Sequence, residues 1–211
     1  MDCTVNTLCR ERILALDGPM GSVEDVYFDD ARWTVRYLVV QTRRWLPGHR
    51  VLIRPGAVVD AASAGRTVRL NLTRSEVDHA PGVDTDRPVV RQHELELAAR
   101  LGQPYYWSSL ALWGAAPEPA LPAHGDPHLR SGAHLIGYRV EGRDGLVGEL
   151  TDFIVELYSW GISAVVIRPR HASRRTAVRL APSCVEGIDC DRHTVSVGVT
   201  RGEIASTTLQ A

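Results

Sequence analysis

The chain has 211 residues, 44% of them hydrophobic and 23% charged, which is typical of a soluble globular protein with one large domain or two small ones. Its formal net charge of −1 provides no overall positive field that would attract nucleic acid or anionic lipid. All 24 residues counted as Lys or Arg are Arg, which excludes a lysine base, a lysine Schiff base and a Walker-type phosphate lysine.

The N-terminal residues and the cysteines indicate a cytoplasmic protein. No basic segment followed by an apolar run opens the chain, and no apolar stretch is long enough for a membrane, so we expect no secretory signal and no transmembrane segment. The four cysteines are then expected as reduced thiols. Cys3 and Cys9, like Cys184 and Cys190, are six residues apart. Metal-binding pairs usually lie closer together, so a metal site built from both termini is the weaker alternative.

The stretch from Leu16 to Val40 contains a cluster of acids that could be a catalytic pair, a metal site or a hairpin turn: Glu24, Asp25, Asp29 and Asp30. Residues 23–28 alternate, and residues 33–40 are β-branched and aromatic, so both ranges predict strands. The short polar turn between them predicts a β-hairpin.

Two further strands follow in the first third of the chain. Residues 51–53 are apolar and end before Pro55, which cannot donate to a strand ladder. Residues 67–73 alternate between apolar and polar side chains. Several short strands with frequent turn signals predict a mainly β fold and a small closed barrel.

The middle segment, residues 81–128, is predicted as a connector. Residues 88–102 read as a helix, with Pro88 at its start and Gly102 at its end. The next stretch is rich in aromatic side chains, which either fill a seam between two domains or bind a protein partner. Together with one aromatic residue of the first domain, they form the candidate partner-binding set: Trp45, Tyr105, Tyr106, Trp107 and Trp113. Residues 114–128 are rich in Pro, Ala and Gly and predict a flexible linker.

The second part of the chain matches the first part at a constant offset, without a gap. Asp17 then falls on Asp144, Gly21 on Gly148, and Trp33 on Trp160. A match of this length indicates an internal duplication. We therefore predict a first domain at residues 1–80, the connector at residues 81–128 and a second domain at residues 129–211.

The second copy decides between the interpretations of the acidic cluster. Asp25 recurs as Asp152, but Glu24 and Asp30 become Thr151 and Leu157. A metal needs several ligands in a fixed geometry, so the two copies cannot share such a site. We expect Asp29 and Asp30 to form a hairpin turn. The Asp25 and Asp152 carboxylates are expected to accept hydrogen bonds from a neighbouring turn, such as the Gly21 or Gly148 backbone.

The second copy carries the densest basic run of the chain. A solvated loop is the simple interpretation, and contact with an anion or with RNA is the alternative. The candidate anion or RNA contacts are Arg168, Arg170, Arg174 and Arg175.

The pattern "DGxxGxVEDxYFDDxxWxVRYLVVxTxxWLPGxxVLIxP", residues 17–55, resembles the PRC-barrel. This module occurs in the cytoplasmic part of the photosynthetic reaction-centre H subunit and in a ribosome-maturation factor. The second copy follows the pattern from Asp144 to Trp160 and then departs from it, and the connector resembles that of tandem bacterial PRC-barrel proteins. The resemblance implies two PRC-barrel-like β-barrels and leaves the activity open.

From the sequence we expect a non-enzymatic adaptor that binds a protein partner, without cofactor, metal or catalytic residue. Surfaces around Trp33, Trp45 and Trp160 would add to the connector aromatics. Three alternatives stay open: association with RNA or the ribosome, a role like that of the reaction-centre H subunit in photosynthetic electron transfer, and a small-molecule or enzymatic role. The sequence is also compatible with a homo-oligomer.

Overall fold

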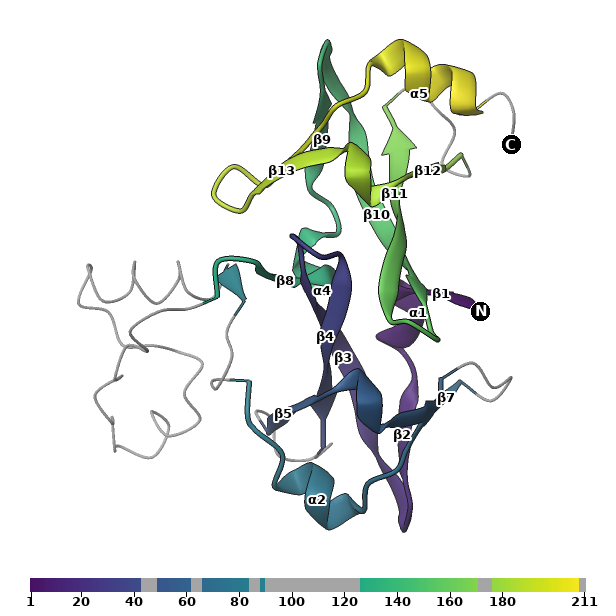
Figure 1. Cartoon of the computed structure of the whole chain (residues 1–211), viewed down its shortest axis with the longest axis vertical. Helices are drawn as coiled ribbons and strands as arrows, with labels where there is room; N and C mark the ends of the chain where they lie inside the picture. Colours follow the sequence, from purple (N-terminus) through teal and green to yellow (C-terminus); the bar gives the residue numbers. More distant parts are fainter. Residues whose placement is uncertain (43–48, 62–65, 84–87, 90–125, 171–175, 209–211) are drawn as a thin grey trace, which may run out of the picture.

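A computed structural model describes residues 1–42, 49–61, 66–83, 88–89, 126–170 and 176–208. The chain is mainly β, as predicted, with short helices at a few strand ends. We call residues 1–83 the N-terminal half and residues 126–208 the C-terminal half. They lie one above the other along the long axis of the molecule (Figure 1).

The N-terminal half begins with a strand and a one-turn helix, continues with a long hairpin, and ends in shorter elements. Its elements are β1 (Asp2–Thr4), α1 (Val5–Leu8), β2 (Arg12–Ala15), β3 (Gly18–Asp29), β4 (Thr34–Gln41), β5 (Arg50–Ile53), η1 (Pro55–Ala57), β6 (Val58–Asp60), β7 (Thr67–Leu70) and α2 (Arg74–Asp78).

The C-terminal half has the same order of elements. These are β8 (Leu129–Ser131), α4 (Gly132–Leu135), β9 (Arg139–Gly142), β10 (Gly145–Glu156), β11 (Gly161–Pro169), β12 (Val178–Leu180), η3 (Pro182–Cys184), β13 (Val185–Asp189), β14 (Thr194–Val197) and α5 (Arg201–Thr208). Most of these elements start at the constant offset that aligns the two copies of the sequence. For example, Gly145 at the start of β10 corresponds to Gly18 at the start of β3.

Local chemistry explains the recurring turns. Gly21 and its counterpart Gly148 lie where β3 and β10 come very close to the neighbouring strand. A Cβ on Gly21 would stand 1.8 Å from the Gln41 carbonyl oxygen, and a Cβ on Gly148 would stand 2.1 Å from the Arg168 carbonyl oxygen. The hairpin between β3 and β4 turns at Trp33, which has a φ of 52°, and the hairpin between β10 and β11 turns at Trp160, with a φ of 58°.

Asp29 accepts hydrogen bonds from the backbone of Ala31 and Arg32, so the predicted hairpin turn is confirmed.

The predicted small closed barrels are not confirmed, because the strands of the described residues form one large sheet that does not close. Its path runs β13-β14-β9-β10-β11-β4-β3-β2-β7-β6, with β1, β5, β8 and β12 paired alongside. The two halves join where β11 meets β4, at the pair Gly161 and Thr34. There the Val35 N–H donates to the Trp160 carbonyl and the Ile162 N–H donates to the Trp33 carbonyl, at 2.8 and 2.7 Å.

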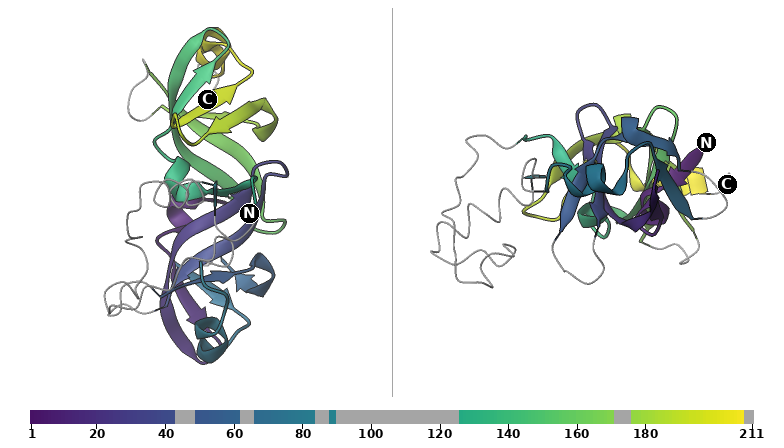
Figure 2. Two further views of the ribbon diagram at one scale, coloured as in Figure 1. Left: turned by 90° about the vertical axis from the view of Figure 1, so that its left-hand side faces the viewer. Right: turned by 90° about the horizontal axis from the view of Figure 1, so that it is seen from below.

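The first strand of each half pairs with the long strand of the other half. β1 pairs with β10, with Cys3 opposite Val155, and β8 pairs with β3, with Arg130 opposite Phe28. Helices α1 and α4 lie together where the two halves meet (Figures 1 and 2). We call this arrangement the reciprocal exchange.

The main hydrophobic core runs through both halves. Val5 and Leu8 of α1 are fully buried in the same cluster as Phe153 and Val155 of β10, and the rings of Phe28 and Phe153 lie 5.1 Å apart. A second, smaller cluster covers the other face of β3, β4 and β5, and contains Tyr27, Val39, Leu52, Val83 and Leu129. The two halves therefore share one continuous core.

Candidate functional site

Asp25 and Asp152 occupy equivalent places at the reciprocal exchange. The Asp25 carboxylate accepts hydrogen bonds from the Ser131 hydroxyl at 2.5 Å and from the Ala133 backbone N–H at 2.9 Å. The Asp152 carboxylate accepts from the backbone and side-chain amides of Asn6, at 3.1 and 3.0 Å. Each aspartate thus binds the start of a short helix that belongs to the opposite half.

The hydrogen-bond partners predicted for these aspartates were wrong. Asp25 and Asp152 bind the exchanged segments, and the Gly21 and Gly148 backbones lie against the neighbouring strand. The hydroxyls of Thr4 and Ser131, each at an N-cap, accept from the backbone N–H three residues on. Thr and Ser at positions 4 and 131 are the one sequence signal for these helix starts.

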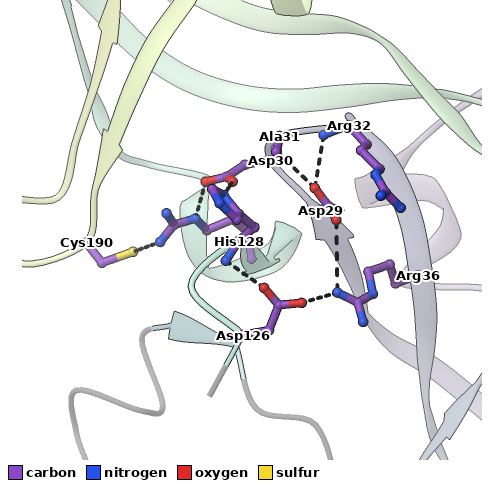
Figure 3. A network of polar contacts seen from close by, with 9 residues as sticks. Asp29, Asp30, Ala31, Arg32, Arg36, Asp126, His128 and Cys190 are labelled. Atoms are coloured by element: carbon purple, nitrogen blue, oxygen red, sulfur yellow. Dashed lines mark hydrogen bonds and ion pairs between the residues drawn. The ribbon is translucent and has the colours of Figure 1, made fainter. Parts of the chain in front are cut away.

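A second polar cluster ties residues 126–130 to the hairpin turn at Asp29 and Asp30 (Figure 3). The Arg130 Nε donates to Asp30 at 2.5 Å, and the His128 Nδ1 lies 2.8 Å from the other carboxylate oxygen of Asp30. Arg36 forms an ion pair with Asp126. We call these five residues, together with Asp29, the turn network.

The charges of the turn network largely compensate one another. Burial raises the pKa of Asp126, but the backbone N–H of His128 and the Arg36 guanidinium outweigh that effect, so the pKa lies below its usual value. Asp30 and Arg130 are both largely buried, with side-chain exposures of 13% and 12%. A buried ion pair with satisfied hydrogen bonds holds two segments in place.

The thiols near these clusters do not have the character of nucleophiles. Burial raises the pKa of Cys9 to about 12, and the nearby charges of Asp25 and Asp152 act in the same direction. Burial also raises the pKa of Cys190, although the Arg130 guanidinium lies 3.4 Å from its sulfur. A reactive cysteine needs a lowered pKa, so both thiols are protonated at neutral pH.

Within the described residues, no group of three or more His, Cys, Asp or Glu side chains could hold a metal ion. In the same part of the chain, no helix is long and apolar enough to cross a membrane.

The predicted basic contacts are only partly described. Arg168 lies on β11 and pairs with Glu149 of β10 at 2.6 Å. Arg170 follows β11, is exposed, and donates its backbone N–H to the Val147 carbonyl. Arg174 and Arg175 lie outside the described residues.

The structure describes some of the predicted aromatic contact residues and not others. Trp160 is only 9% exposed, and Trp33 is partly buried with its ring stacked on Phe28 at 5.7 Å. Both side chains support the core at the hairpin turns. The remaining aromatic candidates lie outside the described residues: Trp45, Tyr105, Tyr106, Trp107 and Trp113.

Another recurring contact links the β2–β3 and β9–β10 turns to the helices that close each half. The Asp17 carboxylate accepts from the Arg74 backbone N–H at 2.7 Å, and the Asp144 carboxylate accepts from that of Arg201 at 2.9 Å. These hydrogen bonds are the main reason why the pKa of each aspartate is lowered.

A scan of the chain against protein-family models gives no match, and a search of curated proteins gives no relative.

We predict that Asp25→Ala and Asp152→Ala each destabilise the protein by about 1–3 kcal/mol, because each removes a carboxylate that accepts two hydrogen bonds from the opposite half. Urea unfolding would show a lower midpoint with an unchanged m-value. Glu141→Ala, which removes an exposed acid on β9, is the matched control and should change stability little. Midpoints of the aspartate variants equal to that of Glu141→Ala would contradict the prediction.

We also predict an acid-dependent loss of stability from Asp17 and Asp144. Their folded-state pKa values are lowered, so their contribution is present above the unfolded value of about 3.9 and is lost as the pH falls below it. In urea melts at a series of acidic pH values, the double variant Asp17→Asn/Asp144→Asn should show a shallower fall in midpoint than the native chain. Parallel curves would rule out this role.

Proposed function

We propose that this protein is a non-enzymatic adaptor of the tandem PRC-barrel type, and that it binds a protein partner through the aromatic residues of its connector. Two PRC-barrel-like units related by duplication are part of this proposal. It is supported by the repeated order of elements in the two halves, by the close strand crossings at Gly21 and Gly148, and by the left-handed turns at Trp33 and Trp160.

The observation that carries the proposal is where the connector leaves the N-terminal half and where the chain returns. Val83 donates its backbone N–H to the Arg50 carbonyl at 3.2 Å and packs in the smaller cluster. Leu129 belongs to the same cluster, and Asp126 pairs with Arg36. The described residues on either side of the connector, Val83 and 126–129, therefore lie against β3, β4 and β5.

Two anchored ends on one face suit a segment that is presented to a partner. Tyr and Trp side chains dominate the energetics of protein interfaces, and the connector sequence concentrates them in residues 105–113. The cost of ordering a long segment falls when its ends are already fixed. The anchoring by the turn network and by Val83 thus favours a binding role for the sequence between them.

The chemistry of the described residues favours binding over catalysis. Asp25, Asp30 and Asp152 are partly buried carboxylates where the two halves meet, and each accepts hydrogen bonds that join segments distant in the sequence. A general acid or base needs access to a substrate proton. These carboxylates instead bind backbone and side-chain groups of segments that are distant in the sequence.

We predict that deleting residues 103–114 abolishes capture of a protein partner while the melting temperature changes little, because both anchors lie outside the deletion. The measurement is a tagged pull-down from lysate of the native organism, at two salt concentrations and with or without nuclease. A full-length chain with Tyr105, Tyr106, Trp107 and Trp113 changed to Ser tests the side chains separately from connector length.

Arg170→Ala serves as the matched control outside the connector and should leave capture intact. Capture that persists after both connector changes would contradict the adaptor proposal. Partners that disappear with nuclease and with high salt would point to the RNA alternative.

A further inference from the structure

The two halves differ at one equivalent place, the outer edge of the strand that follows the long hairpin. In the N-terminal half this strand is β5, and its outer edge is covered by residues 81–83. The Leu52 N–H donates to the Pro81 carbonyl at 2.7 Å, and the Val83 N–H donates to the Arg50 carbonyl at 3.2 Å. The chain thus adds a short extended segment to its own sheet edge.

In the C-terminal half the equivalent strand is β12, and no described residue pairs with its outer edge. Arg179 pairs with Val166 as Leu52 pairs with Val39, so its N–H points away from β11 as that of Leu52 points away from β4. Among the described residues this N–H has no hydrogen-bond partner. Leu52 is only 4% exposed, whereas Arg179 is exposed.

The different ends of the two closing helices explain the open edge. α2 ends at Asp78, and Pro81 and Gly82 then lead the chain back along β5. α5 runs on to Thr208 because its sequence has no proline or glycine at the equivalent positions. The C-terminal half therefore has no counterpart of residues 81–83 along β12 within the part of the chain that the structure describes.

The side chains around this edge define what could occupy it. Val165, Ile167, Val178 and Leu180 are buried in the core, so Val166, Arg168 and Arg179 face outward. Arg168 is paired with Glu149, whereas Arg179 has no acidic partner among the described residues. Where the N-terminal half has a leucine packed against Val83, the C-terminal half has a positive charge for which the described residues provide no acidic partner.

We propose that the outer edge of β12 binds an extended acidic segment of a partner protein by strand addition. A backbone carbonyl of that segment accepts from the Arg179 N–H, and a carboxylate side chain pairs with the Arg179 guanidinium. The pairing of residues 81–83 with β5 is the geometric template for the bound segment. Arg179, which stands where the N-terminal half has Leu52, makes the site positively charged and so favours an acidic segment. This site is independent of the connector aromatics.

The test is amide NMR of the isotope-labelled full chain during titration with a blocked peptide of sequence TVETEVT. We expect the Arg179 amide and its β12 neighbours to shift and to become protected from hydrogen exchange. The charge-reversed peptide TVKTKVT is the control and should bind at least about tenfold more weakly. Arg179→Glu should reverse that preference. Arg179→Pro removes the outward N–H donor of this edge strand together with the guanidinium, and it should abolish binding of both peptides.

Several results would overturn the proposal. One is the absence of any shift on β12 with the acidic peptide, and another is equal binding of the two peptides. Protection of the Arg179 amide in the free protein would show that the chain covers this edge itself, or pairs with a second copy if the protection depends on concentration. A single-stranded RNA oligonucleotide that shifts β12 when the acidic peptide does not would assign the edge to nucleic acid.

Discussion

The structure depends on the reciprocal exchange of two short segments, residues 2–8 and 129–135. Each segment adds a strand to the long hairpin of the opposite half and then enters a one-turn helix. An aspartate of the opposite half binds one backbone N–H in the first turn of that helix. A one-turn helix is too short to be stable by itself. It forms here because Asp25 or Asp152 binds its N-terminus and because residues such as Leu8 and Leu135 are buried in the shared core.

The exchange also determines how the polar residues of the chain are used. Carboxylates inside β-strands would suggest catalysis if only one half were considered. With both halves present, Asp25 and Asp152 are seen to join segments that are far apart in the sequence, and Asp30 does the same through Arg130 and His128. These partly buried carboxylates therefore maintain the geometry from which the connector starts and to which it returns.

The symmetry of the two halves is broken where they differ in sequence. Residues 81–83 cover β5 because proline and glycine end α2, and they carry Val83 into the smaller cluster beside Leu52. In the C-terminal half the closing helix α5 continues instead, and Arg179 stands at the position equivalent to Leu52. One half thus buries its outer face beside Val83, while in the other half no described residue pairs with the outer edge of β12, where Arg179 is exposed.

Much of the fold could be predicted from the sequence because its signals are local. Alternation of side chains indicates the hairpins at residues 23–40, and the internal match of Asp17 with Asp144 and of Trp33 with Trp160 indicates that the second half repeats their pattern. The exchange could not be predicted, because strand pairing between Cys3 and Val155 depends on the three-dimensional arrangement and leaves no local pattern. For the same reason Asp25 could be identified as a hydrogen-bond acceptor inside a strand, but its donors on the opposite half could not.

The central claim is that the exchanged segments, rather than the connector, hold the two halves together. A specific protease site inserted among residues 103–114 would allow the folded full chain to be cut there, and native mass spectrometry would then show what remains associated. We predict that the two fragments stay together as one particle and separate more readily when Asp25→Ala and Asp152→Ala are combined. Fragments that dissociate freely after the cut in the native background would contradict the account.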